Sequence, residues 1–127
     1  MTGERFNATA LLIRESTREA VEQILGAVPN IDLQVVMGAT HQTLSRLRDS
    51  NLPDIILVEI NGRSSNDISD IETLLANHRE KLTVFVTYDG GDIDTMRRLM
   101  RAGVHDAFPQ PLDPSELTHR FNEIIGR

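Results

Sequence analysis

The sequence predicts an α/β domain, a three-layer sandwich in which a five-stranded parallel sheet lies between two layers of helices. Five apolar runs alternate along the chain with five segments of helical periodicity. Right-handed crossovers place strands in such an order in one parallel sheet with helices on both faces. In addition, DIILVEI, residues 54–60, contains four consecutive apolar residues between Pro53 and a polar segment. This pattern is typical of a strand buried on both faces.

The apolar runs have the length of strands and are bounded by turn-forming residues. The fifth run is the weakest, because Pro109 and Pro111 interrupt it and proline cannot donate to a sheet ladder. We expect strands at residues 8–14, 33–39, 54–60, 82–88 and 105–110.

The first and last helices have capping signals. Ser16 and Glu19 have the spacing of a capping box, and Asp113 followed by Pro114 is a typical helix start. The apolar residues that follow recur at helical spacing and should form the buried faces: Ala20, Val21, Ile24 and Leu25 in the first helix, and Leu117, Phe121, Ile124 and Ile125 in the last.

Three further helices are predicted between the strands, around residues 41–50, 66–78 and 92–102. Gly103 follows the third of them and can end it in a left-handed conformation. The residues expected to face the core are Leu44 and Leu47, then Ile68, Ile71, Leu74 and Leu75, and finally Ile93, Met96, Leu99 and Met100.

The composition is that of one soluble globular domain spanning residues 1–127, either a complete protein or the N-terminal domain of a longer chain. The net charge is −6 without a block of like charges, which argues against nucleic-acid binding by net electrostatics. The absence of cysteine excludes disulfides and thiolate metal sites. The apolar runs are far shorter than the roughly 20 residues that span a bilayer, so we expect no membrane insertion and a cytoplasmic location.

The residues that end each strand are candidates for a site, because ligands of open α/β sheets bind at the carboxyl edge. These residues are Arg14-Glu15, Glu59, Thr87 and Gln110-Pro111. Glu59 raises a particular question, since desolvating a carboxylate at the end of a buried strand is costly unless the charge has a partner.

These segments resemble the response-regulator receiver family, the CheY-like domains of two-component phosphorelays, over essentially the whole chain. PDIILVEI resembles the strand with the phospho-accepting aspartate, at the position of Glu59, and TYDGG resembles the fourth strand, with Thr87 in place of the conserved Thr or Ser. AGVHDAFPQP resembles the segment that ends in Lys-Pro, with Pro111 kept. The resemblance implies a flavodoxin-like sheet of order 2-1-3-4-5 and a cis bond between Gln110 and Pro111.

The chain departs from the receiver pattern where that family carries out its chemistry. Arg14 and Glu15 stand in place of the acidic pair that holds Mg²⁺, and Glu59 in place of the aspartate. Gln110 replaces the lysine that contacts the phosphoryl group, and Ala107 replaces the aromatic residue of the fifth strand. The threonine is the only member of the core set that is retained.

The substitutions predict a degenerate phospho-acceptor pocket that holds neither Mg²⁺ nor another cofactor. Glu15 and Glu59 could still offer oxygens to a metal ion, but the Arg14 guanidinium would satisfy both carboxylates without one. Because strands one and three are neighbours in the implied sheet, we expect an ion pair between Arg14 and Glu59. A phosphorylatable acceptor at Glu59, in a working phosphorelay, and a permanent mimic of the phosphorylated state are the alternatives.

Residues 96–117, MRRLMRAGVHDAFPQPLDPSEL, are similar to the N-terminal atypical receiver of the CpaE/TadZ proteins of Flp/Tad pilus assembly. In that family the degenerate receiver precedes a ParA/MinD-type ATPase and is implicated in polar targeting and self-association. This chain has no GxxxxGKS/T phosphate loop, so an ATPase would be a C-terminal domain or a separate partner. The resemblance implies a non-catalytic module for protein interaction, dimerisation or pole-associated localisation.

Receivers commonly dimerise through the fourth helix, the fifth strand and the fifth helix, and these segments are charged here. On this analogy, Arg97 and Arg101 would meet Asp106, Glu116 or Glu123 of a second copy across a two-fold axis. The alternative is a solvated helix face.

A third functional class, a flavodoxin-like enzyme or FMN carrier, shares the sheet order but requires a Gly/Ser/Thr-rich phosphate loop after the first strand and aromatic residues for the flavin ring. The loop RESTRE, residues 14–19, has no glycine for a phosphate loop, and Tyr88 is the only tyrosine.

The DGGD segment, residues 89–92, predicts a turn and a helix cap, because its acids are too few for a calcium loop. Four histidines lie far apart in the sequence, which favours surface or capping roles over metal ligation: His41, His78, His105 and His119.

Overall fold

The computed structural model describes residues 5–78 and 80–126. One parallel sheet runs through the molecule in the order β2-β1-β3-β4-β5, as the sequence predicts. Its strands are β1 (Phe6–Leu12), β2 (Ile31–Met37), β3 (Ile55–Asn61), β4 (Thr83–Asp89) and β5 (Asp106–Pro109).

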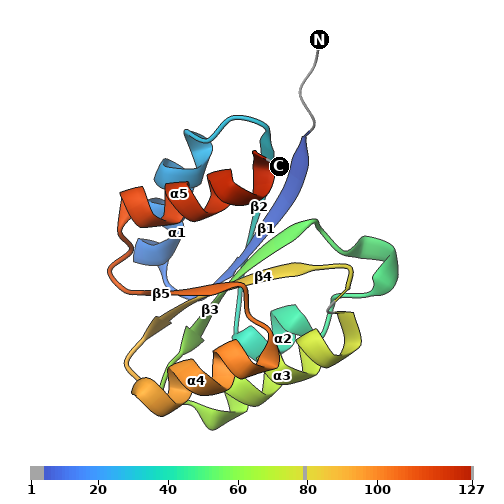
Figure 1. The fold of residues 1–127 in the computed structure, drawn as a ribbon, viewed down its shortest axis with the longest axis vertical. Coiled ribbons are helices and arrows are strands. Elements are labelled where there is room, and N and C mark those ends of the chain that lie inside the picture. Colours follow the sequence, from blue (N-terminus) through green and yellow to red (C-terminus); the bar gives the residue numbers. More distant parts are fainter. Residues whose placement is uncertain (1–4, 79, 127) are drawn as a thin grey trace.

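Helices cover both faces of the sheet and form the two outer layers of the sandwich (Figure 1). The helices α1 (Glu15–Gly26) and α5 (Pro114–Ile125) pack on one face. The helices α2 (Thr40–Leu44), α3 (Ser65–His78) and α4 (Ile93–Ala102) pack on the other. A 3₁₀ turn at Asp49–Asn51 leads into β3. In the described part of the chain no helix is long and apolar enough to cross a membrane.

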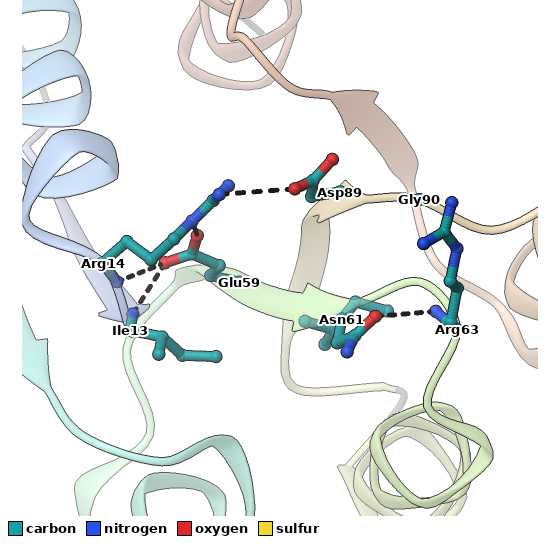
Figure 2. Close-up of a pocket in the computed structure, with 8 residues that line it drawn as sticks. Ile13, Arg14, Glu59, Asn61, Arg63, Asp89 and Gly90 are labelled. Carbon is teal, nitrogen blue, oxygen red and sulfur yellow. Dashed lines mark hydrogen bonds and ion pairs between the residues drawn. The ribbon is translucent and has the colours of Figure 1, made fainter.

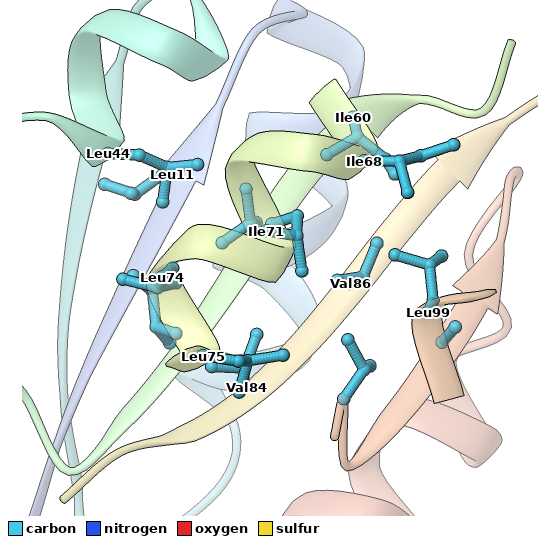
Figure 3. Packing of buried hydrophobic residues seen from close by; sticks show 14 of the residues in the cluster. Leu11, Leu44, Ile60, Ile68, Ile71, Leu74, Leu75, Val84, Val86 and Leu99 are labelled. Carbon is cyan, nitrogen blue, oxygen red and sulfur yellow. The ribbon is translucent and has the colours of Figure 1, made fainter. Parts of the chain in front are cut away.

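The central strand β3 is buried on both faces, as its unbroken apolar run predicts, and contributes to two cores. Ile55 and Leu57 face the core under α1 and α5. Ile56, Val58 and Ile60 face the core under α2, α3 and α4, part of which Figure 3 shows. Because side chains alternate along a strand, Glu59 lies on the α1/α5 side, in line with Ile55 and Leu57.

The predicted capping box of the first helix is wrong. Helix α1 begins at Glu15, directly after Arg14, whose side chain makes no capping hydrogen bond. Strand β1 ends two residues earlier than expected, at Leu12, so the helix starts sooner and Ser16 falls inside its first turn. The predicted buried face is present, since Val21, Ile24 and Leu25 are buried.

The helix predicted around residues 41–50 is shorter than expected and ends at Leu44. Hydroxyl groups in this segment bond to nearby carbonyl oxygens: Thr43 to Ala39 and Thr40, and Ser45 to Gln42. Such local bonds compete with the helical ladder. The chain therefore turns through the 3₁₀ segment before Pro53.

The other helix boundaries lie within one residue of those predicted. Asp92 and Asp113 cap α4 and α5 with their carboxylates, and Gly103 ends α4 at a φ of 107°. The core assignment for α4 is partly wrong, because Ile93 and Met100 are 65% and 46% exposed. The buried stripe of α4 centres on Leu99, which leaves both of these side chains on the outer part of the helix.

Candidate functional site

Glu59 lies in the last part of β3, where the carboxyl ends of β1, β3 and β4 meet. It is opposite Thr87 in the register between β3 and β4. Only 2% of Glu59 is exposed, so the cost of desolvating its charge must be offset by hydrogen bonds or an ion pair.

Five hydrogen bonds converge on the Glu59 carboxylate. One oxygen, Oε1, accepts from the backbone N–H groups of Ile13 at 2.7 Å and Arg14 at 3.0 Å. The other, Oε2, accepts from Arg14 Nε at 3.1 Å, Thr17 Oγ1 at 2.7 Å and Gln110 Nε2 at 3.0 Å. The two oxygens of a carboxylate offer about four lone-pair sites. The acceptor capacity of Glu59 is therefore filled within the chain.

The pKa of Glu59 results from opposing effects. Burial raises the pKa, but the hydrogen bonds from Ile13 N–H, the Thr17 hydroxyl, Arg14 N–H and the Gln110 amide lower it by more. The net result is a pKa below the ordinary value of a glutamate. The group is thus a carboxylate at neutral pH despite its burial.

The predicted ion pair between Arg14 and Glu59 is present. From the end of β1, the Arg14 side chain extends across Glu59 toward Asp89 at the end of β4 (Figure 2). Its Nη1 lies 3.3 Å from Asp89 Oδ2, and this carboxylate is 66% exposed. Asp89 was placed in a turn by the sequence and not in the site, so its role as second partner of Arg14 is new.

Two further predicted pocket residues, Thr87 on β4 and Gln110 directly after β5, join the same network. Gln110 Nε2 donates to Thr87 Oγ1 at 3.2 Å in addition to Glu59, and the Thr87 hydroxyl donates to the Phe108 carbonyl oxygen at 3.0 Å. The bond between Gln110 and Pro111 is cis, as expected.

Comparison with known proteins supports the fold. No family model matches the sequence, and no curated protein is significantly similar to it. Among solved structures, the pilus assembly protein CpaE from Caulobacter crescentus matches with a TM-score of 0.82 and 21% identity, over 96% of this chain and 95% of that one. A response regulator receiver protein from Pseudoalteromonas atlantica matches with a TM-score of 0.72 and 23% identity, over 93% and 97%.

This chain has the CheY-like receiver fold. The same fold also occurs as part of a longer protein. NtrX from Brucella abortus matches with a TM-score of 0.74 and 14% identity, over 96% of this chain but 27% of that one.

Glu15 was predicted to be part of the pocket by analogy with the acidic pair of receivers, but the structure places it outside. Its side chain is 62% exposed and forms an ion pair with Arg18, one turn along α1. It lies outside the Glu59 network because α1 begins at Glu15 itself and turns the side chain to the helix surface. Arg14 therefore bridges Glu59 and Asp89, and the expectation that it joins Glu15 to Glu59 is wrong.

The residues of this receiver pocket do not fit Mg²⁺. That ion needs octahedral oxygen coordination, usually from carboxylates and waters. Here the Glu59 oxygens are filled by donors, and a guanidinium lies beside them. Among residues 5–78 and 80–126, no three His, Asp or Glu side chains gather as a metal site.

One member of the network, Thr17, was missed at the sequence level. Its hydroxyl is buried and donates to Glu59 at 2.7 Å from the first turn of α1. The signal was present, because Thr17, Val21 and Leu25 recur at the i, i+4, i+8 spacing of a buried helix face. A hydroxyl within an apolar stripe needs a hydrogen-bond partner.

The acidic residues of the expected dimer face are paired within the chain. Arg120 lies 2.8 Å from Asp106, 3.5 Å from Glu116 and 3.0 Å from Glu123. Arg97 forms a loose pair with Asp94 at 3.8 Å, and Arg101 is exposed.

The histidines are dispersed, as the sequence indicates. His41 lies 3.2 Å from Asp70, His78 lies 2.8 Å from Asp49, and His119 lies 3.7 Å from Glu123. His105 contacts the Phe85 ring edge-on.

Proposed function

We propose that this chain is a degenerate receiver domain that acts through protein contacts and does not transfer phosphoryl groups. The observation that carries the proposal is the filled acceptor capacity of Glu59. A nucleophilic carboxylate needs an unhindered lone pair in line with the phosphorus atom. Five hydrogen bonds occupy the two oxygens of Glu59, and one comes from a guanidinium beside the carboxylate.

The other two residues of the pocket support the same conclusion. Phosphoryl transfer depends on neutralising the charge that develops on the transferred group. Gln110 is neutral, and its amide donates to Glu59 and Thr87. The Thr87 hydroxyl donates to the Phe108 carbonyl oxygen, so it is held within the sheet.

The biological setting that we propose is pilus assembly. The similarity to CpaE of Caulobacter crescentus supports it, together with the resemblance of residues 96–117 to the same family. In this setting the domain would localise or recruit an ATPase, carried on the same chain or on a partner.

We also propose a homodimer through α4, β5 and α5. Two exposed apolar side chains on α4, Ile93 and Met100, support a contact there, together with Arg97 and Arg101. Asp106, Glu116 and Glu123 would then be shared between Arg120 and the arginines of the second copy.

The proposal is tested by an amide NMR titration with Mg²⁺ and then with beryllofluoride, which mimics a phosphoryl group on a carboxylate. We expect no saturable shifts at Arg14, Thr17, Glu59 and Thr87. The Glu59→Gln variant is the control, because shifts that persist in it do not depend on the carboxylate. Shifts that require Mg²⁺ and vanish in Glu59→Gln would contradict the proposal and establish a phosphorylatable acceptor.

A further inference from the structure

A hollow of about 320 Å³ opens at the carboxyl edge of the sheet in front of Glu59. Its lining includes two arginines, Arg14 and Arg63. Asp89 lies between them and is followed directly by Gly90 (Figure 2). The proposed function gives a role to Arg14 but none to Arg63. Arg63 is therefore a charged group of this hollow that still needs a function.

The backbone fixes the place of Arg63. A tight turn follows β3, in which Arg63 N–H donates to Asn61 Oδ1 at 2.9 Å and Gly62 N–H donates to the Asp89 carbonyl oxygen at 3.0 Å. A Cβ on Gly62 would lie 2.3 Å from the Gly90 carbonyl oxygen. The loops after β3 and β4 thus touch backbone to backbone, and this contact holds Arg63 at the rim of the hollow.

The Arg63 side chain lies along the surface of the other loop. Gly90 has a φ of 80°, and a Cβ there would be 3.1 Å from Arg63 Nε and 3.3 Å from its Cγ. The glycine leaves the space in which the arginine stem runs, and Figure 2 shows the guanidinium beside Gly90. Within residues 5–78 and 80–126, this guanidinium has no hydrogen bond or ion pair, although Arg14, Arg98 and Arg120 each have a carboxylate partner.

Arg14 supplies a second, partly available cation. One edge of its guanidinium is bound to the buried Glu59 at 3.1 Å. Another nitrogen faces Asp89 at 3.3 Å, and that carboxylate is 66% exposed. Exposed ion pairs contribute little to stability, so an incoming anion can replace Asp89 at little cost. Ile13, which is 43% exposed, adds an apolar wall.

We propose that this hollow reversibly binds a small oxyanion, a phosphate or carboxylate group, with Arg63 as its main ligand and Arg14 as its second. Guanidinium groups bind such oxyanions through paired N–H donors. Asp89 acts as an internal competitor, since it occupies the free side of Arg14. The inference rests on the proposed function, because it treats the hollow as a site of reversible binding in which Glu59 accepts no phosphoryl group.

The test is an amide NMR titration with inorganic phosphate and, in a separate arm, with succinate, in EDTA and at constant ionic strength set with sodium chloride. We expect saturable shifts at residues 61–64 and 90–91 with at least one of the two anions, and the two arms identify whether phosphate or carboxylate is preferred. Arg63→Gln should weaken binding by about fivefold or more, because it removes a charge-assisted donor pair. Arg46→Gln removes the same charge from an exposed position just after α2, outside both the hollow and the proposed dimer contact, and should leave the affinity unchanged.

A second variant tests the role of the competitor. Asp89→Asn should tighten binding by about threefold, because the free side of Arg14 no longer faces a carboxylate. A gain of affinity cannot come from misfolding. The inference is overturned if neither anion gives saturable shifts, or if wild type and Arg63→Gln bind equally well. EDTA removes Mg²⁺, so this failure is separate from a Mg²⁺-dependent beryllofluoride response, which would instead refute the proposed function.

Discussion

Replacing Glu59 with glutamine is the most direct test of how the site is held together. The substitution keeps the shape of the side chain and removes its charge. One half of the network can survive, because the amide oxygen can still accept from Ile13 N–H and Arg14 N–H. The other half cannot, since the amide NH₂ would face Arg14 Nε, Thr17 Oγ1 and Gln110 Nε2, which all donate to Glu59 in the wild type.

The magnitude follows from the groups that lose their acceptor. A hydrogen bond to a charged group contributes about 1.5–3 kcal/mol, and such contributions do not add fully. Two of the three opposed donors can adapt: the Thr17 hydroxyl can rotate, and the Gln110 amide can turn over at the expense of its bond to Thr87. Arg14 is 46% exposed, so its released guanidinium regains water. We therefore expect a loss of about 2–4 kcal/mol in the free energy of unfolding at neutral pH.

The same loss should depend on pH. The pKa of Glu59 is lowered by its hydrogen bonds in the folded state. A carboxylate of this kind contributes stability that is present above its unfolded pKa of about 4.3 and is lost as the pH falls through its folded value. The difference between wild type and Glu59→Gln should thus be largest at neutral pH and should shrink below about pH 4.

Urea denaturation at a series of pH values measures both effects. With a slope of about 2 kcal/mol/M, the neutral-pH midpoint should fall by about 1–2 M. Glu15→Gln is the matched control, because its carboxylate is exposed and paired with Arg18 on the helix surface; we expect a change within about 0.5 kcal/mol. Equal effects of the two substitutions, or a Glu59→Gln deficit that persists unchanged at acid pH, would refute the account of the site given above.

Two further substitutions probe the support of the site. Thr17→Val removes one donor to Glu59 without changing the side-chain shape, so it should lower the free energy of unfolding by about 1–2 kcal/mol and raise the pKa of Glu59. Thr9→Val on β1 is the control and should change the free energy of unfolding by no more than about 0.5 kcal/mol. Urea denaturation measures the stability, and NMR titration measures the pKa. Gly62→Ala should cost about 2 kcal/mol or more, because its Cβ would meet the Gly90 carbonyl oxygen at 2.3 Å. Gly26→Ala, with no atom within 4 Å of the added Cβ, should instead be neutral or stabilising by about 0.5 kcal/mol, and a similar loss in both glycine variants would show that the contact between the loops is not what constrains Gly62.

The parts of the site that could be predicted depend on strands, and the parts that could not depend on side-chain direction. Arg14 and Glu59 end adjacent strands, so sheet order alone places them together. Glu15 follows Arg14 directly, but its direction depends on where α1 begins, and that boundary was predicted two residues late. Asp89 is the last residue of β4, opposite Asn61 in the register, but the strand was predicted to end at Tyr88, so Asp89 was assigned to the following turn.

The prediction that Ile93 and Met100 of α4 face the core was wrong for a related reason. A periodic apolar pattern identifies a helix face but not how far the helix covers its sheet. Leu99 is fully buried, whereas Ile93 and Met100 at the margins of the same face are exposed. The burial of a marginal residue depends on the neighbouring layer, which periodicity along one helix does not contain.

Arg14 has a further consequence for any switch in this fold. One guanidinium is paired with two carboxylates, Glu59 and Asp89, at the edge where a receiver would hold a divalent cation. An arginine remains charged at every physiological pH and cannot dissociate from the chain, whereas a metal ion binds and leaves. The charge at Glu59 is therefore balanced by a group that does not leave, and under the proposed function phosphorylation is not needed to set its state. If the domain responds to a ligand, the response must come through groups that this pairing leaves available, and Arg63 is a charged group at the same edge with no partner in the described chain.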